Sequence, residues 1–192
     1  MTAKTKTYDF GMGTVPAHRH KNPGGTMGGW VAETASVADT AYVEKDAKVH
    51  GNAHVWDDAK ILGNAQVFDD AWVYGGARIW GAALIFDNAQ ILGNARVYGH
   101  AQVFGEAKIW GNTEVSGDTG VFGKAEVSGC AQVSDEAEVR GNASVSDDAQ
   151  ISGKAKVMDH AKVFGDAHVS GHVTVADHKQ VCSTAQTNQG RA

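Results

Sequence analysis

The hydrophobic positions of this chain recur with a period of six residues. A Val or Ile stands at every sixth position over 31–181, which gives 26 copies without an insertion. An Ala precedes each aliphatic residue by two positions over 35–167, and the only exceptions are Thr113 and Thr119. A period this strict is typical of a solenoid, in which each repeat packs mainly against its neighbours.

One hexad predicts a very short strand followed by a turn. Side chains alternate between the two faces of a strand, so the Ala and the aliphatic residue share one face. A helix requires apolar residues at a spacing near 3.6, which this pattern does not supply. The Gly or Asp after each strand, followed by a second turn residue, predicts a corner. Hairpins are an alternative arrangement, but identical one-sided strands of this length favour a parallel coil.

The predicted fold is therefore all-β: a single-stranded parallel β-helix. Three hexads form each triangular coil, and residues eighteen positions apart are expected to stack in neighbouring coils. The Val, Ile and Ala side chains point inward and form the core.

The hexads NAQVFD, NARVYG and NASVSD resemble the repeat of the left-handed parallel β-helix superfamily, the hexapeptide-repeat proteins. This resemblance covers residues 31–175 and implies a left-handed coil. The run GGWVAETASV before the regular repeats is similar to the YdcK-like branch, whose members carry an acetyltransferase label without an established activity. The position after each aliphatic residue departs from the acyltransferase pattern, because it often holds Phe, Trp, Tyr or Ser. The resemblance also implies a bacterial or phage origin.

The period divides the chain into three parts. Residues 1–30 precede the repeat and are expected to cap the first coil, because a solenoid must cover its open strand edge. Residues 31–177 form the solenoid. Lys179 occupies an inward position, where a buried unpaired ammonium is costly, so residues 178–192 are expected to form a tail.

The capping segment allows two interpretations. As a cap, it places Phe10, Met27 and Trp30 over the first coil. As a ligand-binding arm, it presents His18 and His20 on either side of an arginine. The need of terminal repeats for a cap favours the first interpretation.

Aromatic residues occupy the outer corner position over 50–110, a region called here the aromatic collar. Stacked in ladders, they stabilise neighbouring coils; as an exposed apolar surface, they predict self-association into a dimer or trimer. The sequence leaves both interpretations open. The predicted interface residues are Trp56, Phe68, Trp72, Tyr74, Trp80, Phe86, Tyr98, Phe104 and Trp110.

The charge of the chain argues against two classes of partner. The formal net charge is −5, so neither nucleic acid nor an anionic membrane is expected to bind it. The N-terminus has no apolar core of a signal peptide, which predicts a cytoplasmic protein.

Lys60, Arg78 and Arg96 share one line along the solenoid, and this basic strip is either an anion site or a solvated face.

The residues do not form a recognisable catalytic motif, so no catalytic residue and no cofactor are predicted. No loop interrupts the repeat, although related acyltransferases often use such a loop at a groove between subunits. We expect a non-enzymatic scaffold or interaction protein. The alternative is an acyltransferase-like enzyme with a site between protomers, using His50 or His54.

A pair of Asp–His dipeptides predicts one further site. Asp159 and His160 lie eighteen residues before Asp177 and His178, so the two pairs share a corner in successive coils. At strand spacing of about 5 Å, two imidazoles and two carboxylates suit Zn²⁺. The alternative is that Asp and His serve only as turn residues here.

Overall fold

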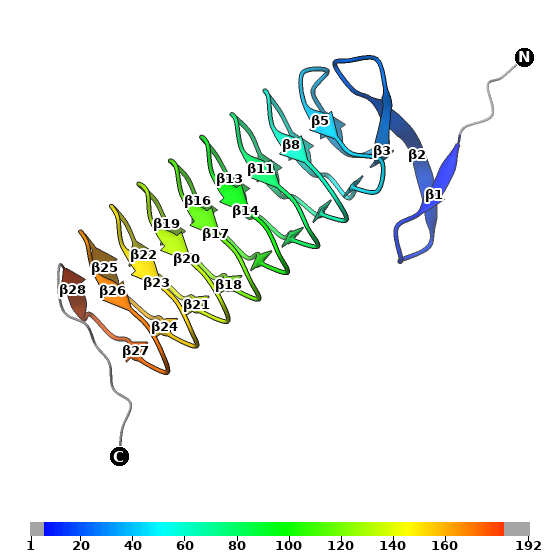
Figure 1. Ribbon diagram of the computed structural model, residues 1–192. Coiled ribbons are helices and arrows are strands. Elements are labelled where there is room, and N and C mark those ends of the chain that lie inside the picture. The colour runs from blue at the N-terminus through cyan, green and yellow to red at the C-terminus, as the bar shows by residue number, and fades with distance from the viewer. Residues whose placement is uncertain (1–5, 183–192) are drawn as a thin grey trace, which may run out of the picture.

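The computed structural model describes residues 6–182, and all regular secondary structure within this range is β-strand. Each strand of the solenoid pairs in parallel with the strands eighteen residues before and after it, as Val73 does with Val55 and Ile91. The successive turns stack along one axis (Figure 1). The parallel β-solenoid expected from the repeat is confirmed, with about eight turns in the described part. Within it, no helix has the length and apolar character needed to cross a membrane.

The strands form three sheets, which are the three faces of the solenoid. The first face contains β3 (Met27–Ala32), β6 (Lys48–Val49), β9 (Gln66–Val67), β12 (Leu84–Ile85), β15 (Gln102–Val103), β18 (Gly120–Val121), β21 (Glu138–Val139), β24 (Lys156–Val157) and β27 (Thr174–Val175). The second face contains β4 (Ser36–Val37), β7 (His54–Val55), β10 (Trp72–Val73), β13 (Gln90–Ile91), β16 (Lys108–Ile109), β19 (Glu126–Val127), β22 (Ser144–Val145), β25 (Lys162–Phe164) and β28 (Gln180–Cys182). The third face contains β5 (Tyr42–Val43), β8 (Lys60–Ile61), β11 (Arg78–Ile79), β14 (Arg96–Val97), β17 (Glu114–Val115), β20 (Gln132–Val133), β23 (Gln150–Ile151) and β26 (His168–Val169).

The core is a column of small and aliphatic side chains. The inward Val, Ile and Ala residues over 41–167 are 0–1 % exposed, so both predicted inward positions are confirmed. Thr113 and Thr119, which replace Ala, are equally buried, and neither Oγ1 has a hydrogen-bond partner in the described structure. Two polar atoms therefore lie inside an otherwise apolar column.

Most corners of the solenoid turn on one residue with a positive φ, which is either Gly or Asp. The turn of Gly81 has a φ of 74°, and a Cβ there would lie 2.8 Å from the carbonyl oxygen of Gly99. Asp tolerates this conformation better than most residues, as at Asp57 with a φ of 55°. Its Oδ2 also accepts a hydrogen bond from the backbone N–H of Gly75 in the next coil, at 3.0 Å.

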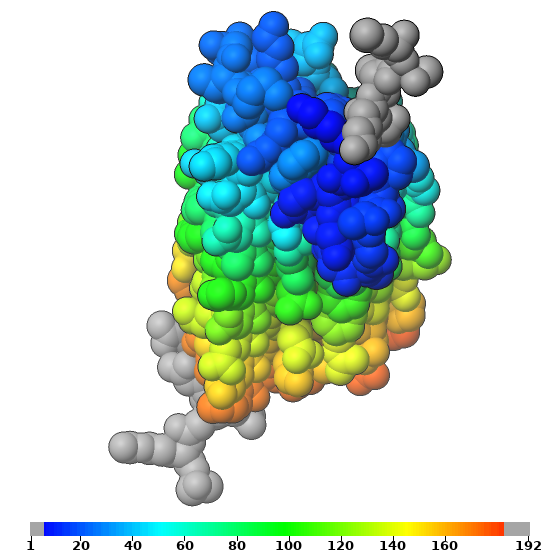
Figure 2. Space-filling model, turned by 90° about the vertical axis from the view of Figure 1, so that its right-hand side faces the viewer, coloured from blue at the N-terminus to red at the C-terminus, as the bar shows by residue number. Residues whose placement is uncertain are grey.

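Two antiparallel strands precede the solenoid. β1 (Thr7–Asp9) pairs with β2 (Thr14–Lys21), which pairs with β3, so the hairpin continues the first face. In Figure 2 this blue hairpin lies in front of the first turns. Met27, expected to cover the first coil, is instead 60 % exposed.

Two side chains of this segment take the place of a strand at the exposed edge of the third face. The side-chain amide of Asn22 donates to the carbonyl oxygen of Val43 at 3.1 Å and accepts from its N–H at 2.9 Å. The Nε2 atom of His20 lies 3.0 Å from the carbonyl oxygen of Ala41. Asn22 and His20 are 3–4 % exposed, so they satisfy edge groups that water would otherwise reach.

The residues of the alternative ligand-binding arm are occupied within the chain. His18 Nδ1 lies 2.8 Å from a carboxylate oxygen of Glu33. Arg19 donates to the backbone carbonyl oxygens of Gly28 and Lys45. These contacts hold the segment to the first coils.

The regular coil continues to Cys182, beyond the boundary expected at residue 177. β28 pairs with β25 through Val181, which is 5 % exposed. Lys179 stands at an inward position, yet its side chain is exposed. It lies in the last coil of the described range, so its ammonium avoids burial. Residues 183–192 of the expected tail lie outside the described residues.

An enlarged inward residue is expected to destabilise the solenoid. Ala95 is fully buried, and Ala95→Leu should overpack the column and lower the free energy of unfolding by roughly 1–3 kcal/mol. The control is Gln90→Leu, which adds an apolar side chain on the outer surface of the same coil. Urea unfolding of both variants measures the difference, and equal stabilities would contradict inward packing of Ala95.

Removing a buried hydroxyl is expected to stabilise the core. Thr119→Val keeps the shape of the side chain and deletes the unpartnered Oγ1, so the free energy of unfolding should rise by about 1 kcal/mol. Thr174→Val, at an exposed position, is the control. A loss of stability in Thr119→Val, measured by the same unfolding method, would show that the hydroxyl makes a necessary hydrogen bond.

Candidate functional site

The corner between the first and second faces holds a continuous aromatic ladder. The centroids of neighbouring rings are 4.7–5.0 Å apart, and the rings from His50 onward are within 5° of parallel. The predicted stacking of the four Phe residues is confirmed. The ladder consists of Phe10, His50, Phe68, Phe86, Phe104 and Phe122.

Phe10 and His50 are the two members of this ladder that were not predicted from the sequence, although His50 lies eighteen residues before Phe68. His50 is 8 % exposed and stacked between Phe10 and Phe68. Its Nε2 atom is buried without a hydrogen-bond partner in the described structure. Burial lowers the pKa of His50 below its usual 6.5, and Gln66 and Asp69 oppose this only in part. The ring is therefore neutral and stacks as an aromatic residue.

The corner between the third and first faces holds a shorter stack. Trp80 and Tyr98 lie 4.2 Å apart and nearly parallel. The Tyr98 hydroxyl donates a hydrogen bond to Glu114 Oε1, and this bond raises the pKa of Tyr98 above its usual 10. The carboxylate of Glu114 is therefore engaged at this corner.

The second face carries a cluster of three aromatic side chains near its N-terminal end, called here the Trp patch: His54, Trp56 and Trp72. Trp56 and Trp72 meet edge to face at 5.3 Å, and His54 lies 4.4 Å from Trp72. Trp56 also donates from Nε1 to Ser36 Oγ at 3.2 Å. The two Trp residues are 40 % and 37 % exposed, whereas the other seven predicted collar residues are partly buried.

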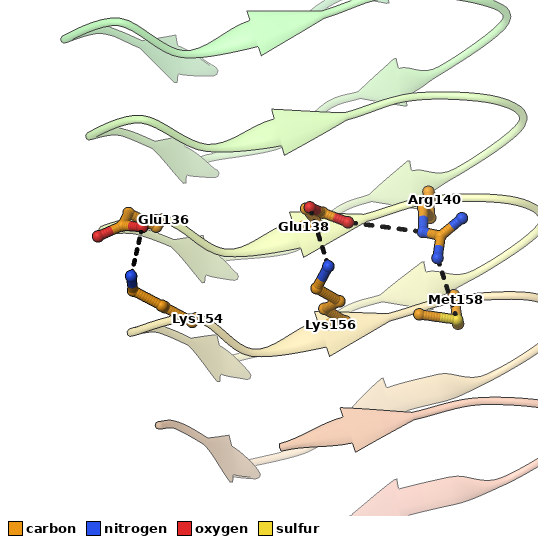
Figure 3. A network of polar contacts seen from close by, with 6 residues as sticks. All are labelled: Glu136, Glu138, Arg140, Lys154, Lys156 and Met158. Carbon is orange, nitrogen blue, oxygen red and sulfur yellow. Dashed lines mark hydrogen bonds and ion pairs between the residues drawn. The ribbon is translucent and has the colours of Figure 1, made fainter. Parts of the chain in front are cut away.

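The second half of the solenoid presents charged side chains instead of aromatic ones. Glu138 on β21 lies between Lys156, at 3.3 Å, and Arg140, at 3.6 Å (Figure 3). Glu136 and Lys154 pair at 3.0 Å beside them. Pairs this exposed contribute little stability. They show that opposite charges align across neighbouring coils here.

The two predicted metal-ligand pairs are neighbours, but their geometry supports stacking. The rings of His160 and His178 lie 4.9 Å apart and 3° from parallel. Asp159 Oδ2 accepts a hydrogen bond from the N–H of Asp177 at 3.4 Å, so this carboxylate serves the corner. Over residues 6–182, no group of three or more His, Cys, Asp or Glu residues is arranged to hold a metal ion. The Nε2 atom of His160 lies 3.3 Å from the side-chain nitrogen of Asn142, and zinc binding at this corner stays a prediction.

The two histidines of the alternative enzyme have different surroundings. His50 is 8 % exposed and is stacked between two Phe rings of the ladder. His54 belongs to the Trp patch and is partly buried, and its Nδ1 atom has no partner in the described structure. Of the two, only His54 adjoins an exposed surface.

Comparison with known proteins agrees with this architecture. Residues 89–105 match a family model described as the YdcK Beta solenoid repeat. The matched segment covers β13, β14 and β15, one strand from each face. A search of curated proteins found no match. The chain therefore carries a YdcK-type β-solenoid repeat, and this comparison concerns the fold.

Replacement of His50 by Phe is expected to reduce the acid sensitivity of the protein. The pKa of His50 is lower in the folded protein than in the unfolded chain, so below pH 6.5 the unfolded chain binds more protons and stability falls. His50→Phe removes this loss and an unpartnered nitrogen, for a gain of about 1 kcal/mol at neutral pH.

Urea unfolding at pH 7.5 and pH 5 tests this expectation, with the exposed His100→Gln as the control for loss of a histidine. The advantage of His50→Phe over the wild type should be larger at pH 5. An equal gain in the free energy of unfolding at both pH values would show that burial does not lower the pKa of His50.

Proposed function

We propose that this chain is a rigid, non-enzymatic scaffold that self-associates through the exposed part of its aromatic collar. The observation that carries the proposal is the Trp patch. Exposed aromatic clusters on soluble proteins are typical of interaction surfaces, because water is displaced from large apolar side chains on contact. The remaining collar residues stack within one chain and make the supporting surface rigid.

A second copy of the same chain is the partner that fits this surface. A two-fold axis through the patch brings Trp72 of each copy against the partner's aromatic side chains, so one cluster serves both sides. The patch lies on a flat parallel sheet, which permits close approach of two copies. A dimer is therefore the simplest assembly, and a trimer is the alternative.

The competing function is an acyltransferase-like enzyme with its site between protomers. The observation that favours it is the unpartnered Nδ1 of His54 within the proposed interface. Thermal unfolding with and without acetyl-CoA distinguishes the two functions. The scaffold predicts no shift of the melting temperature, whereas an acyl-donor site predicts a rise that is lost in His54→Ala.

Polar replacement of the two exposed Trp residues is expected to release folded monomers. Sedimentation velocity should show an oligomer for the wild type and a monomer for the double variant W56S/W72S, with unchanged β-sheet circular dichroism. The matched control is W80S/W110S, which removes two partly buried collar residues outside the Trp patch: Trp80 at another corner, and Trp110 three coils beyond Trp56. A wild type that stays monomeric at high concentration would contradict self-association.

A further inference from the structure

Several charged residues in the second half of the solenoid pair with an opposite charge one coil away. Lys124 pairs with Glu106 at 3.5 Å, eighteen residues away, and the two lysines of Figure 3 pair with Glu136 and Glu138 at the same offset. Opposite charges at directly paired positions stabilise a sheet, and like charges destabilise it. A row of three like charges is therefore an exception that requires an explanation.

The third face contains such an exception. Lys60 pairs in register with Arg78, and Arg78 pairs with Arg96, so three cations lie side by side on β8, β11 and β14. Neighbouring coils are about 4.8 Å apart, and the strip therefore spans about 10 Å along the axis. Within the described residues, none of the three side chains forms an ion pair with a carboxylate.

The surroundings of Arg78 and Arg96 leave their charge uncompensated. Glu114 follows Arg96 in the same row, but its Oε1 is bound by the Tyr98 hydroxyl. The corner segments before and after the two arginines contain no acidic residue. They are residues 74–76, 80–82, 92–94 and 98–100.

An apolar depression lies directly beside this strip. It has a volume of about 430 Å³ and includes Leu62, Arg78 and Trp80 in its lining. Tyr98 stacks on one face of Trp80, and Leu62 occupies the same corner position one coil earlier. Glu44 also lines the depression, but its Oε2 accepts a hydrogen bond from the Gly63 N–H at 2.6 Å. The depression thus combines an apolar floor with one free cation at its edge.

We propose that the third face binds an anionic polysaccharide that runs along the solenoid axis. The spacing of the three cations is close to the length of one sugar residue in an extended chain, so carboxylate or sulfate groups on successive sugars meet Lys60, Arg78 and Arg96. The C–H face of one sugar ring packs on Trp80 and Leu62, since aromatic faces are apolar and carry a negative quadrupole. This site is on a different face from the Trp patch and does not depend on self-association.

Two other polyanions fit this surface less well. Single-stranded nucleic acid binds by stacking successive bases on several aromatic side chains, and the lining of this depression includes one aromatic residue, Trp80. Anionic membranes are recognised by clusters of about four to eight basic residues, whereas this strip has three. The polysaccharide is therefore the occupant that the geometry favours.

Binding of defined polymers to the full chain tests the proposal. Biolayer interferometry should detect heparin, which is sulfated, or polygalacturonate, which is carboxylated, and whichever binds better identifies the anionic group. Neutral dextran should not bind. In the variant R78Q/R96Q the affinity should fall about tenfold, because each exposed charge contact contributes modestly.

The matched control is K108Q/K162Q, which removes two exposed cations from the second face. It should keep the wild-type affinity within about twofold, as expected for charges outside the site. Thermal unfolding should show R78Q/R96Q to be at least as stable as the wild type, because a like-charge contact is relieved.

Four outcomes would overturn the proposal. These are the absence of binding to both polyanions, an equal loss of affinity in the two double variants, tighter binding of oligo(dT), or tighter binding of phosphatidylserine vesicles. The last two would assign the strip to nucleic acid or to a membrane surface.

Discussion

The eighteen-residue register between coils is the constraint on which the rest of the structure depends. Each coil is held to the next by backbone hydrogen bonds at one fixed offset, so a side chain meets its counterpart eighteen residues away. The inward Ala and aliphatic residues make this register favourable, because a shift by one residue would turn the core outward. Any chemical property that repeats with this offset becomes a line along the surface.

The fixed register explains both the stabilising and the destabilising rows of side chains along the surface. Stacking of identical rings stabilises the Phe ladder. The corner Asp residues are stabilising because they accept hydrogen bonds from the next coil. The same rule places Arg78 beside Arg96, where repetition is unfavourable. A repeat protein avoids such a row by alternating the sign of its charges, as Glu136 and Lys154 do. Among the described residues, the three cations in the row on the third face have no such ion pair.

The fold and the ladders could be predicted from the sequence because they depend on periodicity alone. The contacts at the two ends could not, because they are made once. The side-chain amide of Asn22 replaces a peptide group at a strand edge. The residue type alone does not distinguish this role from that of an Asn in a turn. Lys179 was expected to end the coil, but a missing neighbour removes the cost of burial at the last turn. The period describes the middle of a solenoid better than its ends.

The candidate sites show the same division. The sequence left stacked ladders and an exposed apolar surface open as alternatives for the collar, and the structure shows corner stacks together with one exposed cluster. Trp72 projects from the flat sheet, and Trp56 packs against it across the coil, so these two rings lie outside the regular stacks. Because a stacked ring offers little free area, the surfaces available to partners are those where the repeat is broken. In a protein this regular, irregular positions on the outer surface are where partner recognition is most readily encoded.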